Sequence, residues 1–194
     1  MTTSTPAAAG TPIGHRRRGS FLAAMAAGAI IIWTVSTASA SGSAAARARI
    51  VDGGGATIGW ALLTEDGDGR LHLNVQVDGI SPGRHGIHLH AVGACVGPAF
   101  ASAGGHHNPL GATHGLDSPT GAHAGDLPNL QVNVAGRGHL DAVSDRATLS
   151  MGPVSLLDAD GSAIIIHAAE DDQITNPTGN SGARIACGVI EATR

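Results

Sequence analysis

Short runs in which apolar and polar residues alternate recur along the chain from about residue 45 onward. The clearest run is 71–77, where leucine or valine occupies every odd position and a polar residue every even one. Successive side chains of a β-strand point to opposite faces, so this pattern indicates a strand with one buried face. Residues 163–167 differ, because three successive isoleucines there indicate a more fully buried strand.

Glycine, aspartate, asparagine and proline punctuate these runs, and residues 66–69 and 135–138 have the composition of hairpin turns. No stretch after residue 45 keeps a helical periodicity over three turns. Many short strands at regular spacing favour an all-β fold, a Greek-key β-sandwich or flattened barrel of about eight antiparallel strands. Strands are expected at residues 46–51, 58–64, 71–77, 86–91, 130–134, 139–143, 147–149, 163–167 and 184–190.

Two long connections interrupt this rhythm, at residues 92–128 and 168–183. Loops of this length without secondary structure are uncommon in compact domains and are usually functional. Both connections carry or flank histidine and aspartate residues, so we expect them to form a site.

The N-terminal 40 residues have the three parts of a secretory signal. A basic cluster at 15–18 precedes an apolar run at 21–35, and small residues at Ala38 and Ala40 follow in the arrangement of a cleavage site. The alternative is an uncleaved membrane anchor, although a spanning helix needs about 20 mainly apolar residues. We expect cleavage after Ala40, which leaves residues 41–194 as one exported domain, periplasmic or extracellular, with no stable membrane association.

Composition narrows the choice of function further. Residues 1–40 contain three arginines and no acidic residue, so residues 41–194 carry 8 basic against 15 acidic side chains, a net charge of −7. Nucleic-acid binding requires clustered positive charge and is not expected. Export makes a disulfide permissible, and the only two cysteines are Cys95 and Cys187. One bridge between them is the simplest interpretation, and two free buried thiols are the alternative.

Histidines form two groups that could each hold a metal ion. His88 and His90 lie at i and i+2 of a predicted strand, and with His167 they make a rigid set of nitrogen ligands of the kind that favours copper. The second group lies on the first long connection and consists of three nitrogen donors and one oxygen donor, which suits tetrahedral zinc; its members are His106, His114, His123 and Asp126. One imidazole has two ring nitrogens and could join both metals, but spacing alone does not identify which.

These residues, taken with their neighbours, resemble the copper/zinc superoxide dismutases, most closely the exported bacterial type. The resemblance extends from about residue 47 to 191. It is carried by the motifs at residues 86–90, 93–95, 103–109, 114–115, 121–127, 166–168 and 179–190.

The resemblance implies a role for each of these residues. Copper ligands would be His88, His90, His106 and His167, and zinc ligands His106, His114, His123 and Asp126, so that His106 bridges the two ions. Arg184 would attract the anion beside copper, and Asp171 would hydrogen-bond one histidine of each site. Cys95 and Cys187 would form the disulfide within the subunit.

The implied reaction is the conversion of superoxide to O₂ and H₂O₂ by alternating reduction and reoxidation of copper, with a structural zinc. Superoxide is the expected partner, and a homodimer is left open because family dimers use different faces. The alternative is a non-catalytic exported copper/zinc-binding protein, a buffer or chaperone on the same fold. Such a relative would be expected to lose a copper ligand or Arg184, and this chain keeps all of them.

Two features depart from the family pattern. His107 occupies a position that is usually phenylalanine, and because it follows His106 directly we expect it to face away from the copper. The second connection, at residues 168–183, is short compared with the family pattern and lacks lysines, which leaves Arg184 as the obvious positive charge near the site.

Overall fold

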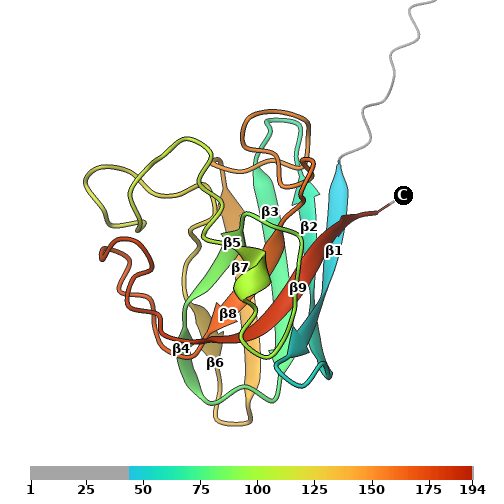
Figure 1. Ribbon diagram of the computed structural model, residues 1–194, viewed down its shortest axis with the longest axis vertical. Helices are drawn as coiled ribbons and strands as arrows, with labels where there is room; N and C mark the ends of the chain where they lie inside the picture. The colour runs from blue at the N-terminus through green and yellow to red at the C-terminus, as the bar shows by residue number, and fades with distance from the viewer. Residues whose placement is uncertain (1–43, 194) are drawn as a thin grey trace, which may run out of the picture. The chain divides into compact units, whose positions relative to one another are not determined.

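The computed structural model describes residues 44–193, whose regular structure is almost entirely β-sheet (Figure 1). Within this range the only helix is one 3-10 turn, η1 (Ala101–Ala103), so none is long enough to span a membrane. The strands are β1 (Ala45–Asp52), β2 (Thr57–Glu65), β3 (Leu71–Asp78), β4 (Gly83–His85), β5 (Ile87–His90), β6 (Leu130–Val132), β7 (Arg137–Ser144), β8 (Ala163–His167) and β9 (Arg184–Ala192).

All nine strands belong to one antiparallel sheet, in the order β4-β6-β7-β3-β2-β1-β9-β8-β5. The two end strands, β4 and β5, are separated in sequence only by Gly86. The sheet therefore curls back on itself and forms a nearly closed, flattened barrel (Figure 1). This confirms the predicted all-β architecture.

The alternating pattern places one face of each strand in the barrel interior. In β3 the leucines and valines at odd positions are buried, whereas the polar residues between them are exposed or half-buried. All five residues of β8 are buried, as its isoleucine run predicts. Because few aromatic residues are available, aliphatic side chains fill this core, and each fully buried leucine, isoleucine or valine contributes about 1.5–3 kcal/mol.

The structure corrects the predicted strands at two places. Residues 147–149 form no strand; Thr148 makes only an isolated bridge with Ser155. The amide of Leu149 instead donates to the carboxylate of Glu65 at the end of β2. This amide is therefore not available for main-chain bonding to a neighbouring strand. The short strand β4 was not predicted; Gly86, where the chain passes from one end of the sheet to the other, separates it from β5, which is the segment predicted at 86–91 shortened by one residue at each end.

Both long connections project from the same side of the barrel, beside β4 and β5 (Figure 1). They are also bonded to each other: the amide of His114 donates to the side chain of Asn176 at 2.9 Å, and the amide of Asp117 to the carbonyl of Gln173 at 3.1 Å. The loops thus form one layer over an end of the sheet. The predicted signal at residues 1–40 lies outside the described residues.

Candidate metal centre

Strand β5 supplies the floor of the site, and the first long loop covers its free edge. Main-chain bonds run from Leu89 to Gly125, from His107 to Leu89 and from Ala91 to Gly105, with lengths of 2.8–3.0 Å. These bonds bring the loop residues beside the strand histidines. Isolated bridges consequently pair His90 with His106 and His88 with Asp126.

Four buried imidazoles converge beside β5. They come from β5, from the first loop and from the end of β8, and their ligand atoms all lie within 4.8 Å of one another: His88, His90, His106 and His167. One nitrogen of each ring has no hydrogen-bond partner in the described part of the chain. The orphaned atoms are His88 Nδ1, His90 Nε2, His106 Nε2 and His167 Nε2.

The other nitrogen of each strand histidine is fixed by an acceptor. His90 Nδ1 donates to the carbonyl of Gly104 at 3.0 Å, and His167 Nδ1 donates to the carbonyl of Gly182 at 3.1 Å. Because a carbonyl can only accept, each ring carries its proton at Nδ1 and leaves a lone pair at Nε2. An acceptor of this kind orients a metal-binding imidazole.

Burial also keeps these rings in the form that binds metal. It is the largest cause that lowers the pKa of His88 to about 3 and that of His167 to about 4, and the positive charge of Arg184 lowers the His167 pKa further. Burial likewise lowers the pKa of His90. At neutral pH these imidazoles are therefore uncharged, as a metal ligand must be.

The second predicted set forms around one oxygen atom, Asp126 Oδ1. It lies 2.9 Å from His106 Nδ1, 3.0 Å from His114 Nδ1 and 3.3 Å from His123 Nδ1, and the His106 and His123 nitrogens are 3.3 Å apart. A tetrahedral zinc with bonds of about 2.0–2.1 Å separates its ligands by roughly 3.3 Å. The observed spacings fit such an ion.

The aspartate is held so that this oxygen stays available. Its other oxygen, Oδ2, accepts the amides of Gly115 at 2.8 Å and His123 at 2.9 Å. Burial alone would raise the pKa of Asp126, but hydrogen bonds from histidines and from the Gly115 amide outweigh it, so the pKa lies below its ordinary value. Asp126 is therefore an anion, the form that can bind zinc.

If ligands are grouped by distance alone, the fourth member of the second set is His88 and not His123; the other three are His106, His114 and Asp126. Both nitrogens of His88 are accounted for elsewhere, however, since Nδ1 faces the first set and Nε2 contacts Asp171 at 2.6 Å. His123 is therefore the better fourth member. His106 is the ring that reaches both sets, with Nδ1 in the second and Nε2 in the first.

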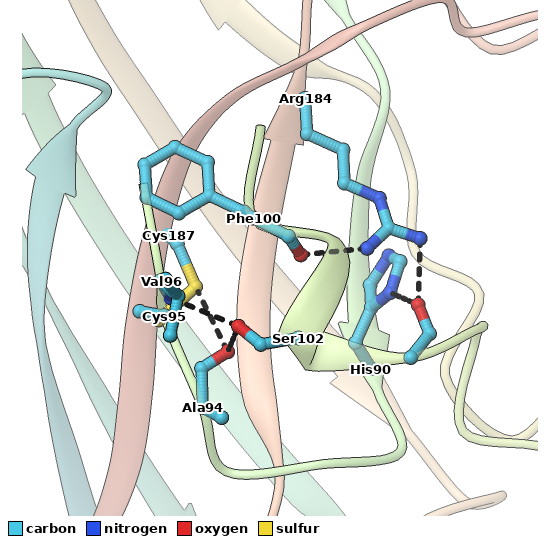
Figure 2. Close-up of a disulfide and its surroundings, with 9 residues drawn as sticks. His90, Ala94, Cys95, Val96, Phe100, Ser102, Arg184 and Cys187 are labelled. Atoms are coloured by element: carbon cyan, nitrogen blue, oxygen red, sulfur yellow. Dashed lines mark hydrogen bonds between the residues drawn. A yellow bond between two sulfur atoms is a disulfide. The ribbon is translucent and has the colours of Figure 1, made fainter. Parts of the chain in front are cut away.

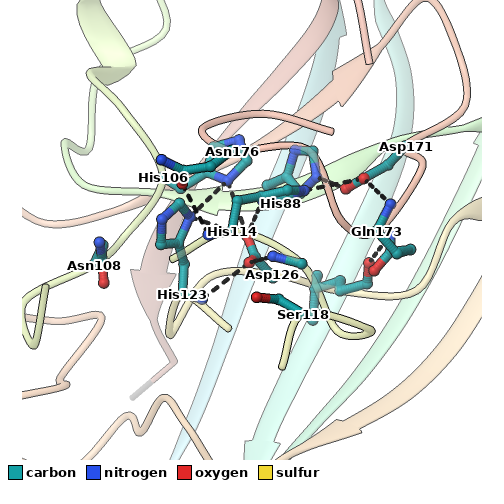
Figure 3. A network of polar contacts seen from close by, with 12 residues as sticks. His88, His106, Asn108, His114, Ser118, His123, Asp126, Asp171, Gln173 and Asn176 are labelled. Atoms are coloured by element: carbon teal, nitrogen blue, oxygen red, sulfur yellow. Dashed lines mark hydrogen bonds and ion pairs between the residues drawn. The ribbon is translucent and has the colours of Figure 1, made fainter. Parts of the chain in front are cut away.

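Asp171 joins the two sets from the side of the second loop (Figure 3). Its Oδ2 lies 2.6 Å from His88 Nε2, and its Oδ1 lies 3.0 Å from His114 Nε2. Buried Asn129 holds the Asp171 main chain in turn, donating to its carbonyl at 2.8 Å and accepting its amide at 2.9 Å. Sequence reasoning missed Asn129, since a lone asparagine after a proline gives no signal of this contact.

The disulfide between Cys95 and Cys187 is present, as predicted, and it links residues 92 apart (Figure 2). Arg184 lies at the start of β9 and is gripped by two main-chain carbonyls. Its Nη1 donates to Phe100 at 2.7 Å, and its Nη2 donates to Gly104 at 2.6 Å. The Gly104 carbonyl thus accepts from both Arg184 and His90.

The remaining histidines lie outside both sets. His107 is buried and belongs to neither, in agreement with the expectation that it faces away. His85 is buried against the main chain, with its Nδ1 2.8 Å from the carbonyl of His167. His72 contacts Asp66 and His139 contacts Asp141 in pairs at the surface.

Comparison with known proteins agrees with this geometry. A family model described as copper/zinc superoxide dismutase matches residues 57–190. Superoxide dismutase-like protein YojM of Bacillus subtilis (strain 168) is 42% identical over 144 residues, which cover 73% of this chain and 74% of that protein. Cu-Zn superoxide dismutase 2 of Aquifex aeolicus (strain VF5) is 40% identical over 156 residues, covering 79% and 91%.

Solved structures give the same result. A superoxide dismutase-like protein from Bacillus subtilis superposes with a TM-score of 0.71 at 41% identity, covering 74% of this chain and 96% of that one. The Cu/Zn superoxide dismutase from Brucella abortus superposes with a TM-score of 0.63 at 28% identity, covering 76% and 99%. On the fold and on sequence, this chain belongs to the copper/zinc superoxide dismutase family.

Proposed function

We propose that the protein is an active superoxide dismutase that binds one copper and one zinc ion. Copper would be held by His88, His90, His106 and His167, and zinc by His106, His114, His123 and Asp126. The observation that carries this proposal is the set of four buried imidazole nitrogens that point together without hydrogen-bond partners. Orphaned buried nitrogens are costly, and a metal ion is the partner that would satisfy all four at once.

When bound, copper supplies one-electron redox chemistry, which lets one superoxide be oxidised and another reduced, and zinc holds the His106 ring without changing oxidation state. The protein supplies the proton and the anion site. Because its Nδ1 would be a zinc ligand, His106 would hold a proton only at Nε2, the atom that faces the copper set. That atom is placed to deliver one of the two protons that reduced superoxide needs to become H₂O₂.

Arg184 would bind and orient the anion. Two of its five N–H groups are used by the carbonyls of Phe100 and Gly104, which fixes the plane of the guanidinium. The positive charge of Arg184 acts on the neighbouring rings of His90 and His167. Burial is the main cause that lowers the pKa values of these two histidines, and this charge lowers them further. A guanidinium stays charged at any working pH, so attraction of a small anion would not depend on protonation.

A non-catalytic metal buffer is the second candidate, and a specific finding keeps it in view. Relatives from Bacillus subtilis are named superoxide dismutase-like, and one solved structure is of a double mutant in which a tyrosine and a proline are replaced by histidine. This chain already has the full histidine set in place. The retained set favours catalysis over storage.

The test is turnover. Protein beginning at Ser41 would be loaded with copper and zinc, its metal content measured, and superoxide consumption followed by a direct optical assay. We expect many superoxide molecules consumed per copper, and loss of this activity in a His167→Ala variant. Tight binding of both metals with no more than one turnover would support the buffer and reject the enzyme.

We also propose export, with cleavage after Ala40. The proposal rests on the basic, apolar and small-residue pattern at residues 15–40 and on a disulfide, which persists in oxidising compartments. Mass spectrometry of protein recovered from the medium or periplasm should show a chain that begins at Ser41. Recovery of the intact chain in a membrane fraction would support the anchor instead.

A further inference from the structure

Arg184 is held by one short segment of the first loop. Both carbonyls that accept its guanidinium, those of Phe100 and Gly104, flank the 3-10 turn η1 (Figure 2). Phe100 is buried and adopts a left-handed backbone, with φ of 53°. The direction of the guanidinium therefore depends on where this turn lies.

Besides a main-chain bond from the Phe100 amide to the Val96 carbonyl at 3.1 Å, one side chain ties this turn to the residues beside the disulfide. Ser102, in the middle of η1, accepts the amide of Val96 at 2.8 Å and donates to the carbonyl of Ala94 at 3.1 Å. These two residues flank Cys95, which is bonded to Cys187 on β9. In the described range, no other side chain bonds to the Val96 amide or the Ala94 carbonyl, apart from a long contact of 3.9 Å between Cys187 Sγ and that carbonyl.

The contacts close a ring that begins and ends on β9. From Cys187 the path runs through the disulfide to Cys95, across the Ser102 hydroxyl to η1, and through two carbonyls back to Arg184, three residues from Cys187. A closed ring of this kind fixes a side chain more firmly than either carbonyl could alone.

We propose that Ser102 is a positioning residue for the anion site, because its hydroxyl transmits the constraint of the disulfide to the carbonyls that aim Arg184. This inference rests on the proposed function of Arg184 as the anion-binding group. Ser102 itself does not touch the metal ligands, so its loss should leave both metal sites intact. The anion site should loosen while copper and zinc stay bound.

The first experiment measures the anion site with azide, a small anion whose binding to the copper-bearing protein changes its visible absorption. In the copper- and zinc-loaded protein, Ser102→Ala should weaken azide binding about fivefold, roughly the effect of losing one net hydrogen bond. Ser102→Thr, which keeps the hydroxyl, should restore it. Ser155→Ala, which removes a hydroxyl that accepts one amide in a different loop, should change nothing. Unchanged azide affinity in Ser102→Ala would overturn the proposal.

The second experiment asks whether Ser102 acts through the disulfide. The double variant Cys95→Ala, Cys187→Ala should weaken azide binding, and adding Ser102→Ala to it should cause no further loss. Residues that act along one path give non-additive effects, whereas independent residues give additive ones. Additive losses would therefore reject the disulfide link.

A third readout does not depend on activity. In the reduced, diamagnetic, copper- and zinc-loaded protein, the guanidinium N–H protons of Arg184 should exchange slowly with water by NMR. Ser102→Ala should speed this exchange by about fivefold, the same factor expected for azide. If the wild-type protein fails to dismutate superoxide but shows this change, Ser102 still positions Arg184 and only the proposed function falls. Equal exchange in both proteins would reject the positioning role.

Discussion

At the level of single residues, the centre is organised by side chains that use both of their polar ends. His106 presents Nδ1 to the set around Asp126 and Nε2 to the other three histidines of the first set, which are His88, His90 and His167. Asp171 contacts His88 with one oxygen and His114 with the other. The two sets are consequently coupled twice, once through a ring and once through a carboxylate.

The double contact of His106 predicts a spectroscopic result. If cobalt replaces zinc, a shared imidazole couples the unpaired electrons of copper and cobalt, and the copper EPR signal should be suppressed. His106→Ala should restore an ordinary copper signal and lower dismutation. The neighbouring His107→Ala is the matched control and should keep the signal suppressed, because His107 belongs to neither set. A suppressed signal in His106→Ala would show that another residue links the metals.

Gly179 offers a test of the carboxylate link. A Cβ at this position would overlap the carboxylate of Asp171 and lie 2.7 Å from His114 Nε2. We expect Gly179→Ala to displace Asp171 and to weaken both metal affinities by about 10- to 100-fold, the usual range for losing a group that orients ligands. Affinity would be measured by competition with a chelator.

Gly111→Ala is the control that separates this clash from backbone strain. Gly111 has φ of +67°, close to the +60° of Gly179, but a Cβ there would meet nothing within 4 Å. Metal affinity should be nearly unchanged in this variant. If both substitutions weaken metal binding equally, strain in the loops is responsible and the contact with Asp171 is not.

At the level of elements, strands were easier to predict than the loops that complete the site. The i, i+2 spacing of His88 and His90 and the alternation in β3 are local properties, so the sequence reveals them directly. Which histidine lies between the two sets depends on how the first loop pairs with β5, and this is a long-range contact. Asn129 contacts the main chain of Asp171, which is 42 residues away, and no local pattern records such a contact. Ser102 contacts main-chain groups six and eight residues before it, but the bonds depend on the turn of an irregular loop that has no periodic pattern.

The missing strand at 147–149 has the same kind of cause. Its amides are bound by a carboxylate more than 80 residues earlier: Glu65 accepts Leu149 N at 2.6 Å and Ser150 N at 2.7 Å. Glu65 is 8% exposed and lies at the end of β2. This carboxylate therefore fastens the β7–β8 connection to the barrel.

This clamp predicts a pH-dependent stability. Burial raises the pKa of Glu65, but the hydrogen bonds from 149 and 150 outweigh it, so the folded pKa lies below the ordinary value of 4.5. The contribution of Glu65 to the free energy of unfolding is therefore complete above pH 4.5, and it is lost as the pH falls through the lower pKa of the folded state. Glu65→Gln should lower the unfolding free energy at pH 7 by about 1–2 kcal/mol, because a neutral acceptor binds amides more weakly.

Urea unfolding of the metal-free protein at pH 7 and pH 3 would measure this effect. The gap between wild type and Glu65→Gln should narrow at pH 3, where the wild-type carboxylate also begins to lose its charge. Exposed Glu191→Gln serves as the control and should match wild type at both values. A gap that stays constant with pH would mean that the carboxylate charge contributes nothing to the clamp.

At the scale of the whole molecule, the barrel and the loop layer are held by different forces. Strands β2, β3 and β7 share continuous main-chain ladders around an apolar core. The loop layer instead depends on polar contacts that converge on Asp126 and Asp171, together with the disulfide. Buried carboxylates and imidazoles without a metal stabilise a loop less than packed aliphatic side chains stabilise a sheet.

Removal of both metals should therefore loosen the loops and leave the sheet intact. By hydrogen exchange, we expect amides in 105–127 and 171–183 to exchange about 100-fold faster in the metal-free protein, the protection that a ligand at 100 times its dissociation constant provides. Amides of β2, β3 and β7 should keep their exchange rates, because their ladders do not pass through the site. A uniform increase over all strands would mean that the metals stabilise the molecule as one cooperative unit, and no increase in the loops would mean that protein contacts alone preform the site.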